Sequence, residues 1–261
     1  MKGIVLAGGL GTRLSPLTKV ASKQLLPIYD KPLIYYPLST LMLAGINEIL
    51  IIATPSQMPR FQDLLGTGSE FGIQLEYKIQ EKPSGIAESL LLAEKFLCGG
   101  KSALVLGDNV FHGSGLGRRL EEFGDISGAQ VFGYHVSDPS QYGIAKVNKD
   151  GSISDLVEKP TSSISKIAIP GLYFFDENAS NRAKELKPSA RGELEILDLL
   201  RSYLSETQLR LELLPRGTAW FDTGTFEDLH EAGTYVRIMQ ERTGERVGDP
   251  YEVAKMRGWI T

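Results

Sequence analysis

A glycine-rich turn followed by two cations is the first segment of the chain whose residue types could do chemistry. The residues are Gly8-Gly9-Leu10-Gly11-Thr12-Arg13, directly after an apolar run, with Lys23 a short distance on. Glycines after a buried strand let backbone N–H groups approach a phosphate closely. These donors and two cations suit a triphosphate whose charge must be neutralised while its phosphorus is attacked. An ordinary turn with a solvated Arg and Lys fits the same residues, because glycine turns after strands are common.

Two common nucleotide-binding motifs are each excluded by a single residue. The dinucleotide fingerprint that would begin at Gly9 requires glycine or alanine where Leu14 stands, which disfavours a Rossmann oxidoreductase. The run Gly99-Gly100-Lys101-Ser102 resembles the end of a Walker A loop, but Lys95 occupies the place of that loop's first glycine. The glycine turn therefore represents a different kind of phosphate site.

Two aspartates at strand ends are candidate metal ligands. Asp108 follows the buried run Leu104-Val105-Leu106, and Asp222 stands shortly before Thr225, a fair helix N-cap. Mg²⁺ prefers a couple of carboxylates, with phosphate and water in its other positions. Aspartate is also a usual turn residue, and spacing alone does not show that the two side chains meet.

Two Glu-Lys-Pro triplets, at 81–83 and 158–160, offer a second type of ligand site. Proline ends a strand and leaves the preceding pair at its exposed end. A glutamate there accepts hydrogen bonds from sugar hydroxyls, and a lysine neutralises a phosphate; a solvated strand end is the alternative. Tyr142, Tyr173 and Trp220 offer faces for stacking on a sugar, although burial in the core is the more frequent role of such residues.

The elements that must position these residues follow from the hydrophobic pattern. Short apolar runs alternate with helical spacing, which is typical of βα units around a mostly parallel sheet. We expect buried strands at 4–6, 49–53, 75–79 and 103–106, and helices at 33–44, 58–65 and 86–96. Farther on, we expect a hairpin of 144–147 and 153–157 around Asp150-Gly151, a loop at 161–165, a strand at 168–175, and helices at 194–204 and 226–239.

Composition narrows the class of protein. The chain has 261 residues, 42% hydrophobic and 23% charged, with a net charge of −4, which argues against a protein that grips nucleic-acid phosphates. Cys98 is the one cysteine, so no intramolecular disulfide is possible, and the three histidines have no zinc-like spacing. The apolar runs are too short to cross a bilayer, and the N-terminus reads as a strand. We therefore expect a cytoplasmic α/β protein with no membrane or nucleic-acid partner, in which oxygen ligands hold any metal.

No linker divides the chain into separate domains. The predicted fold is a single Rossmann-like domain, residues 1–261, with a central, mostly parallel mixed sheet flanked by helices. Residues from about 1 to 127 would form a nucleotide-binding lobe. Residues from about 128 to 261 would carry a second ligand and the C-terminal helices.

These features together resemble the sugar-1-phosphate nucleotidyltransferases over nearly the whole chain. The glycine turn at 8–13 looks like the opening signature of that family, and the run at 29–41 is similar to its thymidylyl branch. Further matching motifs follow in the family's order: Ser22-Lys23-Gln24-Leu25-Leu26-Pro27, Leu106-Gly107-Asp108-Asn109, Tyr142-Gly143, Glu158-Lys159-Pro160, Gly171-Leu172-Tyr173, Arg191-Gly192-Glu193-Leu194-Glu195 and Trp220-Phe221-Asp222-Thr223-Gly224-Thr225. The order and spacing are far more specific than any one motif.

The resemblance implies a role for each matching residue. Catalytic residues would be Arg13, Lys23 and Lys159, and the ligands of Mg²⁺ would be Asp108 and Asp222. The nucleotide would be bound by Gly8, Gly9, Gly11, Thr12, Arg13, Lys23, Gln80, Gly85 and Asp108, with Gln80 and Gly85 reading the thymine edge. The second lobe would bind the sugar phosphate through Tyr142, Gly143, Glu158, Lys159, Ile169, Gly171 and Tyr173.

The implied reaction forms dTDP-glucose and pyrophosphate from dTTP and glucose 1-phosphate with Mg²⁺, in nucleotide-sugar biosynthesis for a deoxysugar such as rhamnose. The resemblance also implies a homo-oligomer, a tetramer or a dimer. The nearest alternative keeps the reaction but uses UTP or another hexose 1-phosphate. A non-catalytic sugar-nucleotide sensor is disfavoured by Arg13, Lys23, Asp108, Lys159 and Asp222, because a sensor does not need an attack geometry.

The chain departs from the family pattern at a few positions. Leu197 and Leu200 stand where Thr and Asn are common, and Ser165-Lys166-Ile167 replaces a usual Ser-Asn-Tyr. These changes leave the transfer residues intact and bear on sugar and subunit contacts. Long members continue with helices that help form a regulatory site for the end product, so we expect that site to be altered or absent in this chain.

Overall fold

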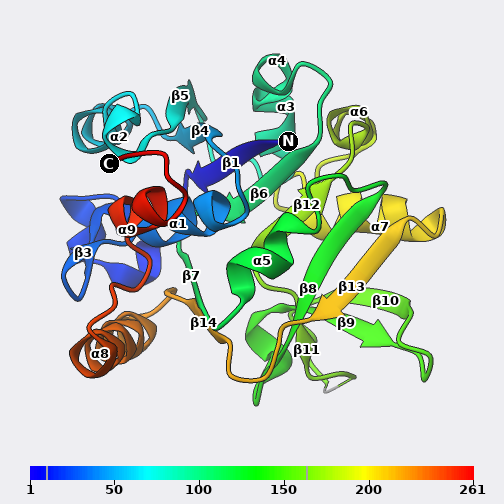
Figure 1. Ribbon diagram of the computed structural model, residues 1–261. Coiled ribbons are helices and arrows are strands. Elements are labelled where there is room, and N and C mark those ends of the chain that lie inside the picture. Colours follow the sequence, from blue (N-terminus) through cyan, green and yellow to red (C-terminus); the bar gives the residue numbers. More distant parts are fainter. Residues whose placement is uncertain (10, 163) are drawn as a thin grey trace. The chain divides into compact units, whose positions relative to one another are not determined.

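The alternation of apolar runs and helical segments produces the predicted α/β fold, seen in a computed structural model that describes residues 1–9, 11–162 and 164–261 (Figure 1). The chain divides into two compact units. Unit 1 comprises Met1, Ser84–Leu104 and Phe123–Arg216, and unit 2 comprises Lys2–Pro83, Val105–Glu122 and Gly217–Thr261. The single-domain organisation with lobes meeting near residue 127 stays a prediction. Leu10 of the glycine turn and Ser163 of the loop expected at 161–165 lie outside the described residues.

Parallel strands form the core of unit 2. Strand β4 (Glu48–Ala53) lies between β1 (Lys2–Ala7) and β5 (Gln74–Ile79), and all three run in the same direction. The apolar residues 49–53 are buried, as parallel strands covered on both faces require. Helix α1 (Tyr35–Leu43) contacts β1, and α2 (Met58–Leu65) contacts β5. Because β1 ends at Ala7, the glycine turn lies at the carboxyl end of this strand.

Two small antiparallel ribbons complete the strands of unit 2. Strand β2 (Pro27–Ile28) pairs with β3 (Lys31–Pro32), and β7 (Asn109–His112) pairs with β14 (Ala219–Asp222). The unit also holds helices α5 (Leu116–Glu121), α8 (Phe226–Thr243) and α9 (Pro250–Met256). Helix α8 begins after Thr225 as predicted, and a capping box between Thr225 and Asp228 satisfies its first backbone donors.

Strand β8 (Ala129–His135) organises unit 1. It pairs antiparallel with β11 (Ile167–Ala168) and β12 (Leu172–Phe175), and parallel with β13 (Leu209–Leu213). The predicted hairpin is formed by β9 (Gly143–Val147) and β10 (Ile153–Glu158), and β11 pairs with β9. The helices of this unit are α3 (Glu88–Leu92), α4 (Glu94–Leu97), α6 (Ala179–Glu185) and α7 (Ile196–Ser205). Strand β6 (Ser102–Leu106) contains the boundary between the two units.

The predicted mixed sheet with parallel core strands and flanking helices is confirmed, but several element boundaries differ from the expectation. Helix α1 begins at Tyr35, and α8 continues to Thr243. The strand expected at 168–175 is interrupted between β11 and β12, where Pro170 has no N–H to donate. The helix expected at 86–96 is two short helices that meet at Ala93. Helix α7 begins two residues later than expected, because the backbone of Leu194 bonds to Ser84 and Ala87 instead.

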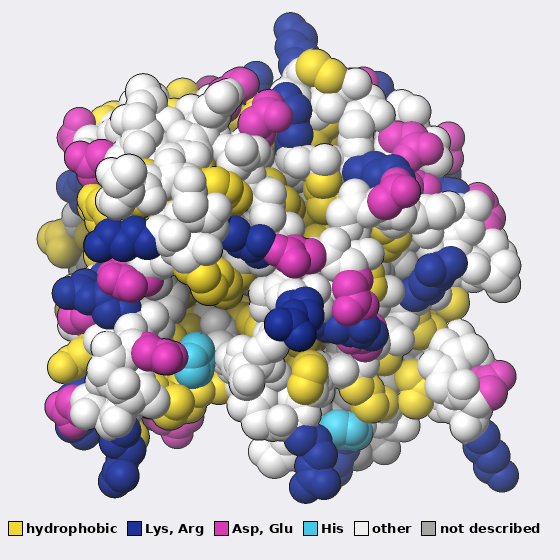
Figure 2. Space-filling view, viewed as in Figure 1, with side chains coloured by type: hydrophobic (Ala, Val, Ile, Leu, Met, Phe, Trp, Pro, Cys, Tyr) yellow, Lys and Arg dark blue, Asp and Glu magenta, His cyan; other side chains and the backbone are white. Residues whose placement is uncertain are grey.

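No helix within the described ranges is both long and apolar enough to span a bilayer. On the face shown in Figure 2, Lys and Arg side chains are interspersed with Asp and Glu. This mixture is what the nearly balanced charge of the sequence leads one to expect.

Candidate active site

The glycine turn lies where β1 ends, as the sequence predicts. Gly11 has a left-handed backbone (φ 59°) and caps a single 3₁₀ turn, Thr12–Leu14, which carries Arg13. The hydroxyl of Thr18 donates a hydrogen bond of 2.9 Å to the carbonyl oxygen of Gly11. Thr18 therefore fixes the base of the segment from which the Arg13 side chain extends, a role that the sequence did not reveal.

Lys23 is buried and paired with one of the predicted metal ligands. Its Nζ lies 2.8 Å from Oδ2 of Asp108, while Oδ1 of Asp108 accepts a 3.0 Å bond from the side-chain amide of Asn109. The other end of that amide, Oδ1 of Asn109, accepts a 2.7 Å bond from the indole N–H of Trp220. Trp220 is thus buried and supports this network, in line with the core position expected for such a ring. Asn109 is a site residue that sequence reasoning did not single out.

Asp108 and Asp222 are brought together by the β7–β14 ribbon. Asn109 pairs with Asp222 in the register of the ribbon, and both the backbone N–H (3.2 Å) and the hydroxyl (2.8 Å) of Thr223 donate to the carbonyl oxygen of Asp108. Burial and the neighbouring Asp108 carboxylate raise the pKa of Asp222 to about 6. This pair of neighbouring carboxylates, one of them with a raised pKa, forms a donor set that a divalent cation would stabilise.

The donor set is small. Within the described ranges, no group of three or more His, Cys, Asp or Glu side chains is placed to hold a metal ion. A pair of carboxylates suits Mg²⁺, which leaves most of its positions to phosphate oxygens and water, better than it suits zinc, which takes three or four protein ligands.

The network around Asp108 gives a test of its supporting residues. Trp220→Phe keeps an aromatic ring but removes the indole donor to the buried Asn109 oxygen. We expect the free energy of unfolding in urea to fall by about 1–3 kcal/mol, the usual cost of removing one partner of a buried hydrogen bond. Trp259→Phe, at the chain's other tryptophan, which is partly exposed, is the control and should cost less. Equal losses for the two variants would contradict a specific role for the Trp220 donor.

Gln80 lies directly against the glycine turn. It is buried at the end of β5, and its backbone N–H donates 2.9 Å to the carbonyl oxygen of Ala53. A Cβ at Gly8 would collide with Oε1 of Gln80, so the glycine allows this close approach. The structure thus brings together two of the predicted nucleotide-binding residues.

Gly85, the second predicted thymine reader, belongs to unit 1. It has φ 105°, and a Cβ there would collide with the backbone of Leu194. The backbone N–H of Leu194 donates 2.7 Å to Ser84, and that of Ala87 donates 3.1 Å to Leu194. The segment Arg191–Glu195 therefore holds the Gly85 turn in place. The sequence around either segment does not reveal this contact.

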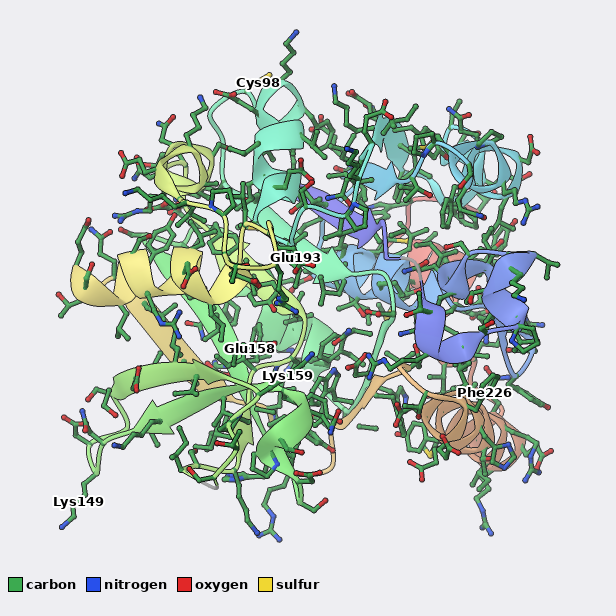
Figure 3. The ribbon with its side chains drawn as sticks, turned by 180° about the vertical axis from the view of Figure 1, so that it is seen from behind. Cys98, Lys149, Glu158, Lys159, Glu193 and Phe226 are labelled. Carbon is green, nitrogen blue, oxygen red and sulfur yellow. The ribbon has the colours of Figure 1, made fainter. Side chains whose placement is uncertain are left out.

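Most of the predicted sugar-phosphate residues gather at one end of the β9–β10 hairpin. Glu158 pairs with Gly143, the N–H of Lys159 donates 2.9 Å to the carbonyl of Tyr142, and the N–H of Ile169 donates 2.8 Å to that of Gly143. Figure 3 shows Glu158 and Lys159 next to each other. Oε1 of Glu158 lies 3.9 Å from Nζ of Lys159. Burial raises the pKa of Glu158 despite the nearby cations, Lys159 first among them.

The remaining two predicted sugar residues lie in the core. Gly171 is buried just before β12, and the buried ring of Tyr173 stacks on Phe175 at a centroid distance of 6.2 Å. Their contact with a sugar stays a prediction. Leu197, one of the departures from the family pattern, packs close to Gly143, since a Cβ on Gly143 would meet its methyl carbons at 3.4 and 3.5 Å.

A separate hollow of about 890 Å³ lies in unit 2 and contains none of the predicted site residues. It is lined mainly by α5, α9 and the segment between α8 and α9, and by His112. Nδ1 of His112 lies 2.7 Å from the hydroxyl of Tyr235, and burial lowers the pKa of the imidazole. His112 therefore has a hydrogen-bond partner in Tyr235.

The fold, with the carboxylates of Asp108 and Asp222 near Lys23, is compatible with the predicted class of nucleotidyl-transferring enzymes. Residues 2–237 match the nucleotidyl transferase family, and the chain belongs to that family. Relatives named glucose-1-phosphate thymidylyltransferase include one from Xanthomonas campestris pv. campestris (strain B100), 53% identical over 99% of this chain and 88% of the relative. Another, from Mycobacterium tuberculosis (strain ATCC 25618 / H37Rv), is 48% identical over 100% of this chain and 90% of the relative.

Solved structures of similar fold include enzymes that act on sugar nucleotides by name. A crystal structure of a Bacillus anthracis protein in complex with sucrose is 36% identical, has a TM-score of 0.86 and covers 97% of this chain and 99% of that one. A UDP-glucose pyrophosphorylase complexed with UDP-glucose is 25% identical, with a TM-score of 0.80, over 91% of this chain and 98% of that one.

Proposed function

We propose that this chain is a glucose-1-phosphate thymidylyltransferase, which forms dTDP-glucose and pyrophosphate from dTTP and α-D-glucose 1-phosphate. The observation that carries the proposal is that Asp222, which pairs with Asn109 in the β7–β14 ribbon, lies near Asp108, with Lys23 bonded to Asp108, in the unit that also holds the glycine turn. The names of the relatives, at about half identity over the whole chain, support the choice of nucleotide and sugar.

The chemistry requires no covalent nucleophile and no general base, because the oxygen of a sugar phosphate is already anionic at neutral pH. The barrier comes from bringing two polyanions together in line. Asp108 and Asp222 would hold Mg²⁺, which would supply positive charge to the nucleotide phosphates. The raised pKa of Asp222 supports this assignment, since a cation there would relieve the repulsion between the two carboxylates.

The chain's own cations would do the remaining neutralisation. Arg13 and Lys23 would contact the triphosphate, and Arg13 would stabilise charge that moves onto the departing pyrophosphate. The 2.8 Å bond to Asp108 holds the Lys23 ammonium in a fixed position, so little reorganisation is needed when the nucleotide binds. Gln80 and Gly85 would read the thymine edge, and Lys159 would neutralise the sugar phosphate.

Lys159 gives a test of sugar-phosphate binding that leaves the nucleotide aside. We expect Lys159→Ala to raise KM for glucose 1-phosphate by about 10- to 100-fold, the range for a lost charge-assisted hydrogen bond. KM for dTTP should change little. Lys149→Ala, at the exposed tip of the same hairpin and pointing away from it in Figure 3, is the matched control. If KM for glucose 1-phosphate stayed at the wild-type value in Lys159→Ala, the assignment would be wrong.

The choice of substrates is tested by pyrophosphate release across a panel of dTTP and UTP with glucose 1-phosphate and other hexose 1-phosphates. The proposal expects the highest kcat/KM for dTTP with glucose 1-phosphate. A higher value for UTP or another hexose would favour the nearest alternative. No release with any pair would overturn the proposal and favour a non-catalytic sensor.

Three further expectations belong to this proposal. They are a homo-oligomer, either a tetramer or a dimer, a cytoplasmic location, and a product used in a deoxysugar pathway. The mass of the protein in solution, measured by light scattering, tests the first directly, and a monomer would contradict it.

A further inference from the structure

The turn between Asp222 and helix α8 is held rigidly on both sides. The N–H of Gly224 donates 2.6 Å to the carbonyl oxygen of Asp222, and Thr223 is anchored twice to Asp108. Thr225 begins the capping box of α8. The backbone of Gly224 therefore has little freedom to move. A side chain that packs against Gly224 contacts a surface of fixed position.

The group that packs on Gly224 is the guanidinium of Arg13. A Cβ at Gly224 would lie 3.0 Å from Nη2, 3.3 Å from Cζ and 3.4 Å from Nη1 of Arg13, and these are its three nearest atoms. The φ angle of Gly224 is outside the left-handed region, so its backbone accepts an ordinary L-residue. A side chain at this position would therefore meet the Arg13 guanidinium, and the turn itself does not exclude it.

Arg13 is held at its other end by the glycine turn. The side chain leaves the 3₁₀ turn that follows Gly11, whose carbonyl oxygen accepts the hydrogen bond from Thr18. The cation therefore extends from one fixed segment and rests on another. Its tip lies beside the turn that carries Asp222, one of the predicted Mg²⁺ ligands.

We propose that Gly224 is a positioning residue for Arg13. Because Gly224 has no side chain, the Arg13 guanidinium lies against its Cα beside Asp222, and from this position the guanidinium acts on the nucleotide phosphates. The inference rests on the proposed function, because it assigns Gly224 a role in the same transfer. A methyl group at this position has to displace the guanidinium by a few tenths of an ångström or more, since the guanidinium is the flexible partner. The backbone and α8 need not move.

The test is the kinetics of Gly224→Ala. We expect kcat to fall about 10-fold, because small displacements of a positioned group cost one to two orders of magnitude, while KM for glucose 1-phosphate stays unchanged. The thermal unfolding midpoint should stay near that of the wild type. Gly233→Ala is the matched control, because this glycine lies on α8 and a Cβ there meets only the backbone N of Tyr29, at 3.6 Å. Its kcat should be unchanged.

A double-mutant cycle distinguishes an effect of Gly224→Ala on the position of Arg13 from any other effect of the added methyl group on kcat. In the Arg13→Ala background, Gly224→Ala should cause no further loss of kcat, since there is no guanidinium left to displace. The same 10-fold loss in both backgrounds, or wild-type kcat in Gly224→Ala, would overturn the inference. A wild-type enzyme that formed no dTDP-glucose would instead overturn the proposed function.

Discussion

Arg13→Ala is expected to lower kcat by about 10²-fold or more, the loss seen when one preorganised donor to a developing charge is removed. Arg13 supplies charge where pyrophosphate departs, and its guanidinium is already placed on the turn at Gly224 before substrates arrive. In the variant, water molecules would have to reorient to stabilise the charge on the departing pyrophosphate, and that reorientation raises the barrier. The measurement is pyrophosphate release at saturating dTTP and glucose 1-phosphate, so that a weaker KM does not enter the comparison.

Arg237→Ala is a suitable control for Arg13→Ala. Arg237 lies on α8 in the same unit and forms an exposed ion pair with Glu241, which is worth little in stability. Its removal should leave kcat and the unfolding midpoint unchanged. If Arg13→Ala kept near-native turnover at saturating nucleotide, the catalytic role of Arg13 and the inference drawn for Gly224 would both be lost.

Asp108→Asn and Asp222→Asn are each expected to abolish most of the Mg²⁺-dependent activity while the fold is retained. An amide keeps the shape of the side chain but removes the negative charge that a divalent cation requires. Asp222→Asn should not lower the free energy of unfolding measured without Mg²⁺, because the pKa of Asp222 is raised and its ionised form is therefore disfavoured by folding. Asp108→Asn also removes the ion pair with Lys23, so it should be the less stable of the two variants.

The measurement is a titration of activity with Mg²⁺, alongside unfolding in urea. Asp63→Asn is the matched control, since Asp63 is an exposed residue on α2 in the same unit. It should give the wild-type curve. Unchanged Mg²⁺ dependence for both Asp108→Asn and Asp222→Asn would show that these carboxylates do not hold the metal.

The local elements were predictable because their residues determine them alone. The buried run at 49–53 is short and rich in β-branched residues, which favours a central parallel strand, and Thr225 caps α8 with a side chain that lies within its own turn. Gly8 and Gln80 were both implied by the resemblance to the family, and the structure places them in direct contact.

The assembly of the site was not predictable, because it depends on pairing between distant segments. Asp108 and Asp222 meet through the register of β7 with β14 and through two donors from Thr223, and neither leaves a periodic pattern in the sequence. Likewise, the interruption of the strand at 168–175 reflects a single Pro170 in a run whose apolar character is continuous. Hydrogen bonds such as Thr18 to Gly11 depend on a loop path that no spacing rule describes.

The central claim is that an oxygen of glucose 1-phosphate attacks the α-phosphorus of dTTP. Isotopic labelling of the phosphate of glucose 1-phosphate tests this claim most directly. The wild-type protein is incubated with dTTP, Mg²⁺ and glucose 1-phosphate whose phosphate oxygens carry ¹⁸O, and the products are separated and weighed by mass spectrometry. Attack at the α-phosphorus forms a new P–O bond and releases unlabelled pyrophosphate, so we predict that all of the label remains in dTDP-glucose. Label in pyrophosphate or in free phosphate, or no dTDP-glucose at all, would contradict the account.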